Sequence, residues 1–230
     1  MRTTEPPAAE PHSGTAGTSP DGPLRLVYPG SPDAAEKILA AANEAGHRHP
    51  VTVSEALISD PYRALRAGEA DVMITRFRID EPDLTVGPVL YTEGRVVAVA
   101  AGHPLAGRAS VSSDDLADHD LFQRPGAFPA DVYDQLVPHV SAQGRPLVRR
   151  CPADSMQDMF AAIVEGRAVH PTIESMRAVS HPGVVYVPIT DLDPAPVCLV
   201  WVTARTSPAV LAFAQAAAEG FAVPATGAQR

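Results

Sequence analysis

The sequence contains very little cysteine and no long apolar run. Its two cysteines, Cys151 and Cys198, are too few and too far apart for a disulfide framework, so free buried thiols are predicted. No segment approaches the roughly 18 consecutive apolar residues that a membrane-spanning helix needs. These absences argue against a disulfide-stapled module and against a protein that spans a membrane.

Basic residues are also scarce. The 230 residues carry 18 Lys and Arg against 27 Asp and Glu, which gives a formal net charge of -9. A protein that binds nucleic acid neutralises phosphates with a clustered basic face, and only Arg145, Arg149 and Arg150 come close together. We therefore expect this chain alone to bind DNA poorly.

Common catalytic and metal-binding motifs are absent as well. The sequence holds no G-x-S-x-G, no G-x-x-x-x-G-K-[ST], no G-x-G-x-x-G and no H-E-x-x-H motif. His47 and His49 lie in a turn without a cysteine or carboxylate at metal-ligand spacing, and Glu44 alone does not complete a zinc site. We expect neither a metal nor a cofactor.

The start of the chain is rich in Pro, Gly, Ser, Thr and Ala and shows no periodicity. It also lacks the apolar segment of about 7–15 residues that a secretion signal contains. Residues 1–23 are therefore predicted to form a disordered tail, and residues 224–230 a short C-terminal tail. The protein is predicted to be cytoplasmic.

The next part of the chain alternates between apolar strands and short helices. Strands are predicted at 24–28, 51–56 and 72–75. A helix follows the first strand with Ser31 as its N-cap, and a shorter helix follows the second strand from Ser59 or Asp60. This succession predicts a parallel α/β unit. Two more strands are expected, at 84–90 and 95–101.

The pattern restarts after Gly102-His103-Pro104. A helix capped by Asp154 or Ser155 carries an apolar stripe whose methionines, Met156 and Met159, are predicted to fill the core. Before this helix come a short helix from Ser112 or Ser113, a strand at 121–123, a helix at 129–137 and a strand at 146–150. After it come a strand at 168–170, a helix from Pro171 and Thr172, strands at 183–189 and 197–203, and a last helix from Ser207.

Five segments match the pattern of one known family and occur in the same order: Leu65–Thr75, Pro82–Val89, His103–Arg108, Gly166–Thr172 and Tyr186–Ile189. They resemble the effector-binding domain of LysR-type transcriptional regulators. The resemblance implies an α/β fold of two Rossmann-like lobes, as in periplasmic binding proteins, with a ligand cleft between them. Lobe I would be 24–101 plus 190–223, and lobe II 102–189. The helix-turn-helix segment that precedes this domain in the family is missing from the sequence.

Ligands of open α/β sheets bind beyond the carboxyl ends of the strands, beside helix N-termini. These places carry the candidate ligand-binding residues, which are Ser31, Ile58, Ser59, Thr75, Arg76, Phe77, Arg124, Asp154, Ser155, His170, Pro171 and Thr172. Arg76 is suited to a carboxylate ligand or to a surface salt bridge. His170 is suited to a ligand hydrogen bond, to acid or base chemistry, or to a structural hydrogen bond.

The leading hypothesis is a protein that binds a small molecule, an organic acid or another metabolite, and acts as a sensor or regulatory module without its own DNA-binding domain. The alternative is an enzyme of secondary metabolism, a cyclase, isomerase or dehydratase that uses the cleft with His170 as acid or base. A third hypothesis is a dimerisation partner of full-length regulators. The resemblance also implies a homodimer, or a heterodimer with a related regulator, through the helix at 32–45 and a helix of lobe II, with no membrane contact.

Overall fold

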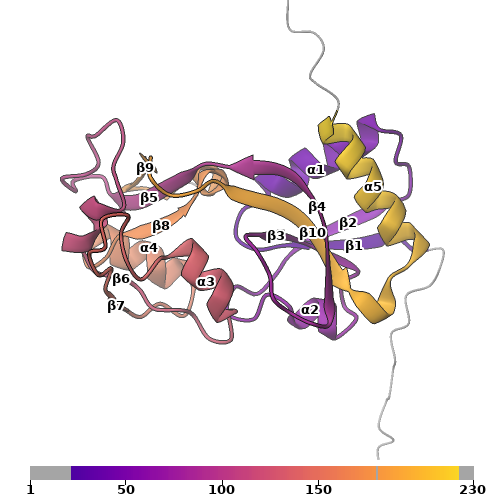
Figure 1. The fold of residues 1–230 in the computed structure, drawn as a ribbon, viewed down its shortest axis with the longest axis horizontal. Coiled ribbons are helices and arrows are strands. Elements are labelled where there is room, and N and C mark those ends of the chain that lie inside the picture. The colour runs from indigo at the N-terminus through magenta and orange to yellow at the C-terminus, as the bar shows by residue number, and fades with distance from the viewer. Residues whose placement is uncertain (1–21, 180, 223–230) are drawn as a thin grey trace, which may run out of the picture.

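The computed structural model describes residues 22–179 and 181–222. The predicted tails, 1–23 and 224–230, fall outside these ranges except for residues 22 and 23. In the described part, two lobes lie side by side and are joined by long strands that run from one to the other (Figure 1). No helix of the described part is long and apolar enough to cross a membrane.

The first lobe is built on a five-stranded sheet. In spatial order its strands are β2 (Val51–Glu55), β1 (Leu24–Tyr28), β3 (Val72–Arg76), β10 (Ala195–Val202) and β4 (Leu84–Glu93). β1 pairs in parallel with both β2 and β3, which confirms the predicted parallel α/β unit. β10 runs antiparallel to β3 and β4. All of β3 is buried, as expected for a strand covered on both faces.

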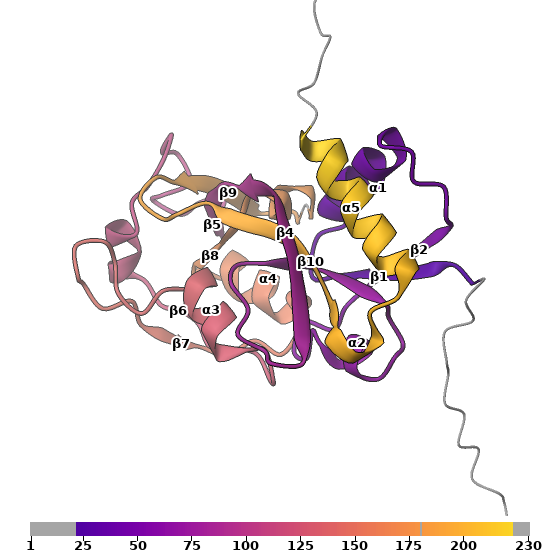
Figure 2. The ribbon, with the colours of Figure 1, turned by 45° about the vertical axis from the view of Figure 1, so that its right-hand side comes forward.

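Helices α1 (Asp33–Glu44), α2 (Arg63–Arg66) and α5 (Pro208–Ala222) and the short 3-10 helix η3 (Thr203–Arg205) complete the first lobe. α1 and α5 lie next to each other in both views (Figures 1 and 2). Ile38 of α1 and Phe213 of α5 are fully buried and pack with Leu26, Ile74 and Leu199 of the sheet. This shared core holds the two helices on the sheet.

The second lobe has a three-stranded sheet in the order β8 (His170–Ile173), β5 (Arg95–Ala100) and β9 (Val184–Ile189). A smaller sheet pairs β6 (Leu121–Phe122) with β7 (Arg149–Cys151). Its helical elements are α3 (Ala130–Leu136), α4 (Met156–Val164) and the 3-10 helices η1 (Asp114–Asp118) and η2 (Glu174–Ala178). Val97, Leu116, Leu121, Val169 and Val187 form its main core.

One lobe boundary differs from the predicted division. β5 pairs with β8 and β9, so it belongs to the second lobe, whereas the sequence analysis assigned 24–101 to lobe I. The chain enters the second lobe at Gly94, between β4 and β5. An apolar run such as that of β5 indicates a strand buried on both faces but not the sheet to which it belongs. The chain returns to the first sheet between β9 and β10, next to the predicted boundary at 189 and 190.

Some local predictions hold and others do not. Cys151 and Cys198 are free and buried, as predicted. Ser155 caps α4 and accepts a hydrogen bond from the backbone N–H of Asp158 at 3.1 Å. The prediction of a helix that begins at Pro171 is wrong, because β8 runs from His170 through Pro171 to Ile173. β8 is an edge strand of its sheet, where a residue without an N–H is tolerated.

The N-cap position of α1 is occupied by Pro32, not by Ser31 as predicted. The Ser31 hydroxyl accepts the N–H of Asp33 at 3.4 Å and donates a hydrogen bond to the carbonyl oxygen of Ser175 at 2.8 Å, inside the protein. Ser31 follows β1 in the first lobe and Ser175 lies in η2 of the second lobe. The serine therefore joins the two lobes.

Candidate functional site

A cavity of about 140 Å³ lies between the two lobes. Its first-lobe wall is formed where β1, β2 and β3 end, by Pro29, Gly30, Ile58, Thr75, Arg76 and Phe77. The second-lobe wall includes the N-terminus of α4, the strand β8 and the helix α3. This is the place at which ligands bind to open α/β sheets. Gln123, Asp154 and Ser155 are exposed lining residues and mark the side that meets solvent.

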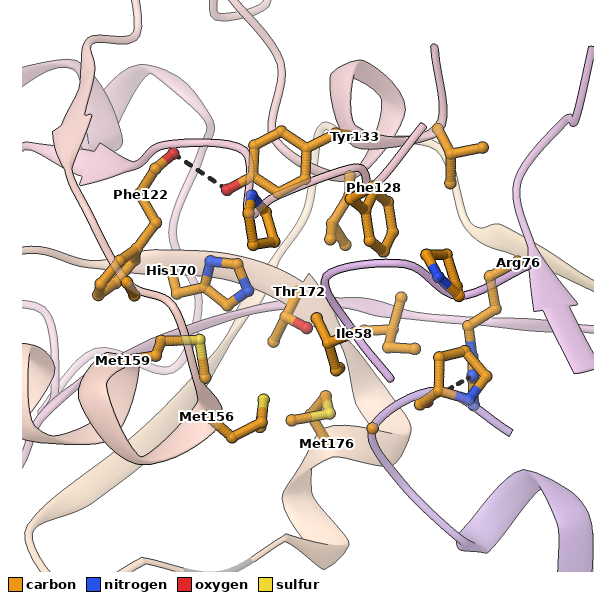
Figure 3. A pocket seen from close by; sticks show the side chains of 18 of the residues that line it. Ile58, Arg76, Phe122, Phe128, Tyr133, Met156, Met159, His170, Thr172 and Met176 are labelled. Atoms are coloured by element: carbon orange, nitrogen blue, oxygen red, sulfur yellow. Dashed lines mark hydrogen bonds between the residues drawn. The ribbon is translucent and has the colours of Figure 1, made fainter. Parts of the chain in front are cut away.

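Methionine is concentrated in this cavity. The sequence has five methionines, and each one after Met1 lines the cavity: Met73, Met156, Met159 and Met176. Figure 3 shows Met156, Met159 and Met176 on one side of the pocket, with Phe128 and Tyr133 on the opposite side. Flexible thioethers adapt to the shape of a bound group and make favourable contacts with aromatic rings. The methionines predicted to fill the core thus also form a pocket wall.

His170 and Thr172 provide polar groups in this apolar surrounding. They are two residues apart on β8, so both side chains point to the same face of the strand, toward the cavity (Figure 3). His170 is 8 % exposed, and its ring meets the ring of Phe122 edge-on at 5.6 Å between centroids. Within the described residues, neither His170 nitrogen nor the Thr172 hydroxyl has a hydrogen-bond partner.

The imidazole of His170 is neutral at pH 7. The pKa of His170 is lowered to about 4, mainly by burial and to a smaller extent by the positive charge of Arg95. A neutral imidazole offers one N–H donor and one acceptor nitrogen. A buried polar group without a partner costs roughly 1–3 kcal/mol, so His170 is ready to bind a group that satisfies it.

Arg76 reaches the cavity from the end of β3 but is held by other groups. Its guanidinium forms a buried ion pair with Glu93 at 3.5 Å and donates to the Ser175 hydroxyl at 3.2 Å. It also donates to the carbonyl oxygen of Pro29 at 3.4 Å. The Ser175 hydroxyl in turn donates to Glu93 at 2.7 Å. The charge of Arg76 is thus opposed by a carboxylate of the protein itself.

A second buried arginine lies behind the cavity wall. The three side-chain nitrogens of Arg95 donate to the carbonyl oxygens of Thr172, Gln135 and Leu136. The guanidinium also sits over the ring of Phe77, 5.0 Å from its centroid. Phe77 has a φ of 69°, which side-chain-bearing residues seldom adopt, and such strain is often found beside binding sites.

Comparison with known proteins places this geometry in a family. The family model for the LysR substrate binding domain matches residues 17–222. The chain belongs to the LysR substrate-binding domain family. A search of curated proteins found no match. As a LysR substrate-binding domain, the chain is a small-molecule-sensing module of transcription regulation, and its two-lobed α/β fold confirms the fold class predicted from the sequence.

Solved structures of LysR regulators share this fold. Full-length CbnR in complex with its target DNA is 21% identical, with a TM-score of 0.65 over 87% of this chain and 71% of CbnR. The BenM effector-binding domain with its effector benzoate is 20% identical, with a TM-score of 0.64 over 90% of this chain and 97% of that domain. The reduced regulatory domain of OxyR from Pseudomonas aeruginosa is 19% identical, with a TM-score of 0.60 over 85% of this chain and 97% of that domain.

The cavity of this LysR domain brings together eight of the twelve candidate residues, namely Ile58, Thr75, Arg76, Phe77, Asp154, Ser155, His170 and Thr172. The other four, Ser31, Ser59, Arg124 and Pro171, are not among its lining residues. The guanidinium of Arg124 donates to the carbonyl oxygens of Gly126 and Phe128, and the Ser59 carbonyl accepts the N–H of Ala127. The ligand-binding role of the twelve stays a prediction.

Sequence reasoning missed the aromatic and methionine part of the lining. Tyr62, Phe122, Phe128, Tyr133 and Met176 line the cavity. Tyr133 in α3 carries no motif, and its hydroxyl donates to the carbonyl oxygens of Phe122 and Gln123. Met156 and Met159 were detectable, because they follow the predicted cap of α4 and so begin at the candidate site. In residues 22–179 and 181–222, no three His, Cys, Asp or Glu side chains gather as a metal site.

Proposed function

We propose that this domain senses a small organic molecule that binds in the cavity between the lobes. The observation that carries the proposal is His170, a neutral imidazole that faces the cavity with both nitrogens unpaired among the described residues. Because the walls come from both lobes, a ligand there contacts both and stabilises one arrangement of them. No observation favours the enzyme hypothesis.

Assembly and location belong to the same proposal. We infer a dimer, because full-length LysR regulators of this fold are among the similar structures. We also infer that another part of the assembly binds DNA, because this chain has a net charge of -9. The cytoplasm is the corresponding location of a transcription regulator. Light scattering that gives a monomer at tens of micromolar would contradict the dimer.

The experiment is a thermal-shift screen of small organic molecules on the full chain. A ligand at about 100 times its dissociation constant adds about 2.7 kcal/mol to the free energy of unfolding. Ile58→Trp should fill the cavity from the half-buried Ile58 position and remove the shift. Leu57→Trp is the matched control, because Leu57 is 59% exposed and is not a lining residue. Equal shifts in both variants would place the ligand elsewhere.

A further inference from the structure

Among the described residues, the two arginines nearest the cavity are already engaged by groups of the protein itself. Arg76 and Asp154 line the cavity, while Glu93 and Arg95 lie directly behind it. Arg76 is paired with Glu93 and only its Nε has no hydrogen-bond partner among the described residues, while each side-chain nitrogen of Arg95 already donates to a carbonyl oxygen. A bound carboxylate would add a buried negative charge close to Glu93. Burying a charge without a partner is strongly unfavourable.

The polar end of the cavity suits a neutral group instead. His170 and Thr172 together offer an N–H, a ring nitrogen and a hydroxyl, and none of these is paired within the described residues. Binding an anion would favour a protonated His170, although burial and the charge of Arg95 disfavour that form. A hydroxyl, carbonyl or amide of a ligand can bond the Thr172 hydroxyl and the His170 Nε2, which unlike Nδ1 is not enclosed, without any change of charge.

The size and walls of the cavity fit one ring. An apolar cavity of roughly 150 Å³ in another protein admits benzene, and this cavity measures about 140 Å³. The ring would lie between the sulfur atoms of Met156, Met159 and Met176 and the aromatic rings of Phe128 and Tyr133 (Figure 3). Sulfur–aromatic and edge-to-face contacts both favour an aromatic ring in this place.

We propose that the pocket selects an uncharged ligand with a single aromatic ring and one hydrogen-bonding group, which His170 and Thr172 bind, and that it excludes carboxylates. This inference rests on the proposed function, because it names the ligand class of the same cavity. It differs from an organic acid, one of the ligand classes that the sequence suggested, with which Arg76 could have paired. It also sets this pocket apart from that of BenM, whose effector is benzoate.

Four probes with the same ring test the proposal by calorimetry on the full chain: benzyl alcohol, benzamide, toluene and benzoate. At about pH 7 benzoate is ionised and the other three are neutral. We expect benzyl alcohol and benzamide to bind about tenfold or more tightly than benzoate, with dissociation constants of about 1 mM or below. Toluene should bind more weakly than benzyl alcohol, because it leaves His170 and Thr172 unpaired.

Variants assign the effect to named groups. Thr172→Val keeps the shape of the side chain, and His170→Phe keeps a ring without nitrogens. Each should weaken benzyl alcohol about three- to tenfold and leave toluene within about twofold. His181→Phe is the matched control, because His181 is not a lining residue. Glu93→Gln should strengthen benzoate binding about tenfold or more, since it leaves Arg76 free to pair with the ligand.

The possible outcomes separate this inference from the proposed function. Benzoate binding as tightly as benzamide would overturn the selection of neutral ligands and leave the cavity as the binding site. Failure of all four probes at about 10 mM would overturn the single-ring ligand. If the neutral probes bind but Ile58→Trp does not weaken them, the cavity itself is the wrong site and the proposed function fails.

Discussion

His170 shows how one buried side chain links stability to ligand recognition. Its imidazole lies in an apolar wall with the ring of Phe122 against it and with Arg95 near enough to disfavour a second positive charge. A protein chosen for stability alone would carry an apolar residue here, because an unpaired buried imidazole costs free energy. A ligand that forms hydrogen bonds with the imidazole would offset this cost and would explain why a histidine occupies the position.

We predict that His170→Gln reduces the loss of stability in acid. The unfolded imidazole titrates near its ordinary pKa of 6.5, but the folded one titrates at about 4. Between these values the unfolded chain binds a proton that the native protein does not, so the free energy of unfolding falls as the pH falls, by up to about 3 kcal/mol. Glutamine does not titrate, so this part of the slope should vanish.

Urea unfolding at several pH values between 7 and 4 measures this difference. His139→Gln is the control, because the His139 side chain is 65% exposed. Parallel pH profiles for His170→Gln and the unaltered protein would contradict the prediction, since they would mean that His170 titrates alike in the folded and unfolded states.

Residues at strand ends were predictable from the sequence, and residues on helix faces were not. Arg76 ends the apolar strand β3, so its position beside the cleft follows from general sheet geometry. His170 was predicted to end a strand, but it is the first residue of β8. Tyr133 and Met176 reach the same cavity from α3 and η2, and no local pattern reveals that these elements meet. The partner of Arg76 was also hidden, because Glu93 lies 17 residues away at the end of another strand.

At the scale of elements, close packing of α1 on α5 depends on small residues. A Cβ atom at Gly220 of α5 would lie only 2.1 Å from the carbonyl oxygen of Ala41 in α1. On α1 the small buried residues are Ala34, Ala35, Ala41 and Ala42. The helices can therefore approach only if position 220 has no side chain.

We predict that Gly220→Ala lowers the free energy of unfolding by about 1–3 kcal/mol, because overpacking outweighs the gain in helix propensity. Gly102→Ala is the matched control, since a Cβ there meets no atom within 4 Å. Thermal and urea unfolding of the two variants measure the difference. Equal stability of the two would show that the helices shift apart at little cost.

The sequence predicted the elements better than their pairing. The parallel strands β1, β2 and β3 were expected, because apolar strands alternating with helices favour that arrangement. The sheet to which β5 belongs was not predicted, because an apolar run of this kind is equally compatible with a strand of either lobe. The extension of β8 past Pro171 was missed for a related reason: proline is usual at a helix start, and only the finished sheet shows that β8 lies at an edge.

At the scale of the whole molecule, hydrogen bonds hold the lobes against each other beside the cavity. The Ser31 hydroxyl donates to the Ser175 carbonyl, and the N–H of Ala127 donates to the Ser59 carbonyl at 2.6 Å. The amide of Gln135 bonds both backbone groups of Arg78. Because the cavity walls come from both lobes, these contacts should set how often the complete binding site is present.

We predict that Ser31→Ala weakens ligand binding although Ser31 does not line the cavity. The substitution leaves the buried carbonyl of Ser175 without its donor, which should lower the free energy of unfolding by about 1–3 kcal/mol and favour separation of the lobes. Ser207→Ala is the matched control, because the Ser207 hydroxyl accepts the N–H of Val210 within the first lobe. Both variants should melt earlier, but only Ser31→Ala should raise the dissociation constant of a ligand found by the thermal screen. Faster hydrogen exchange around Ser175 in that variant would locate the change, whereas unaltered affinity would show that the binding site forms without this contact.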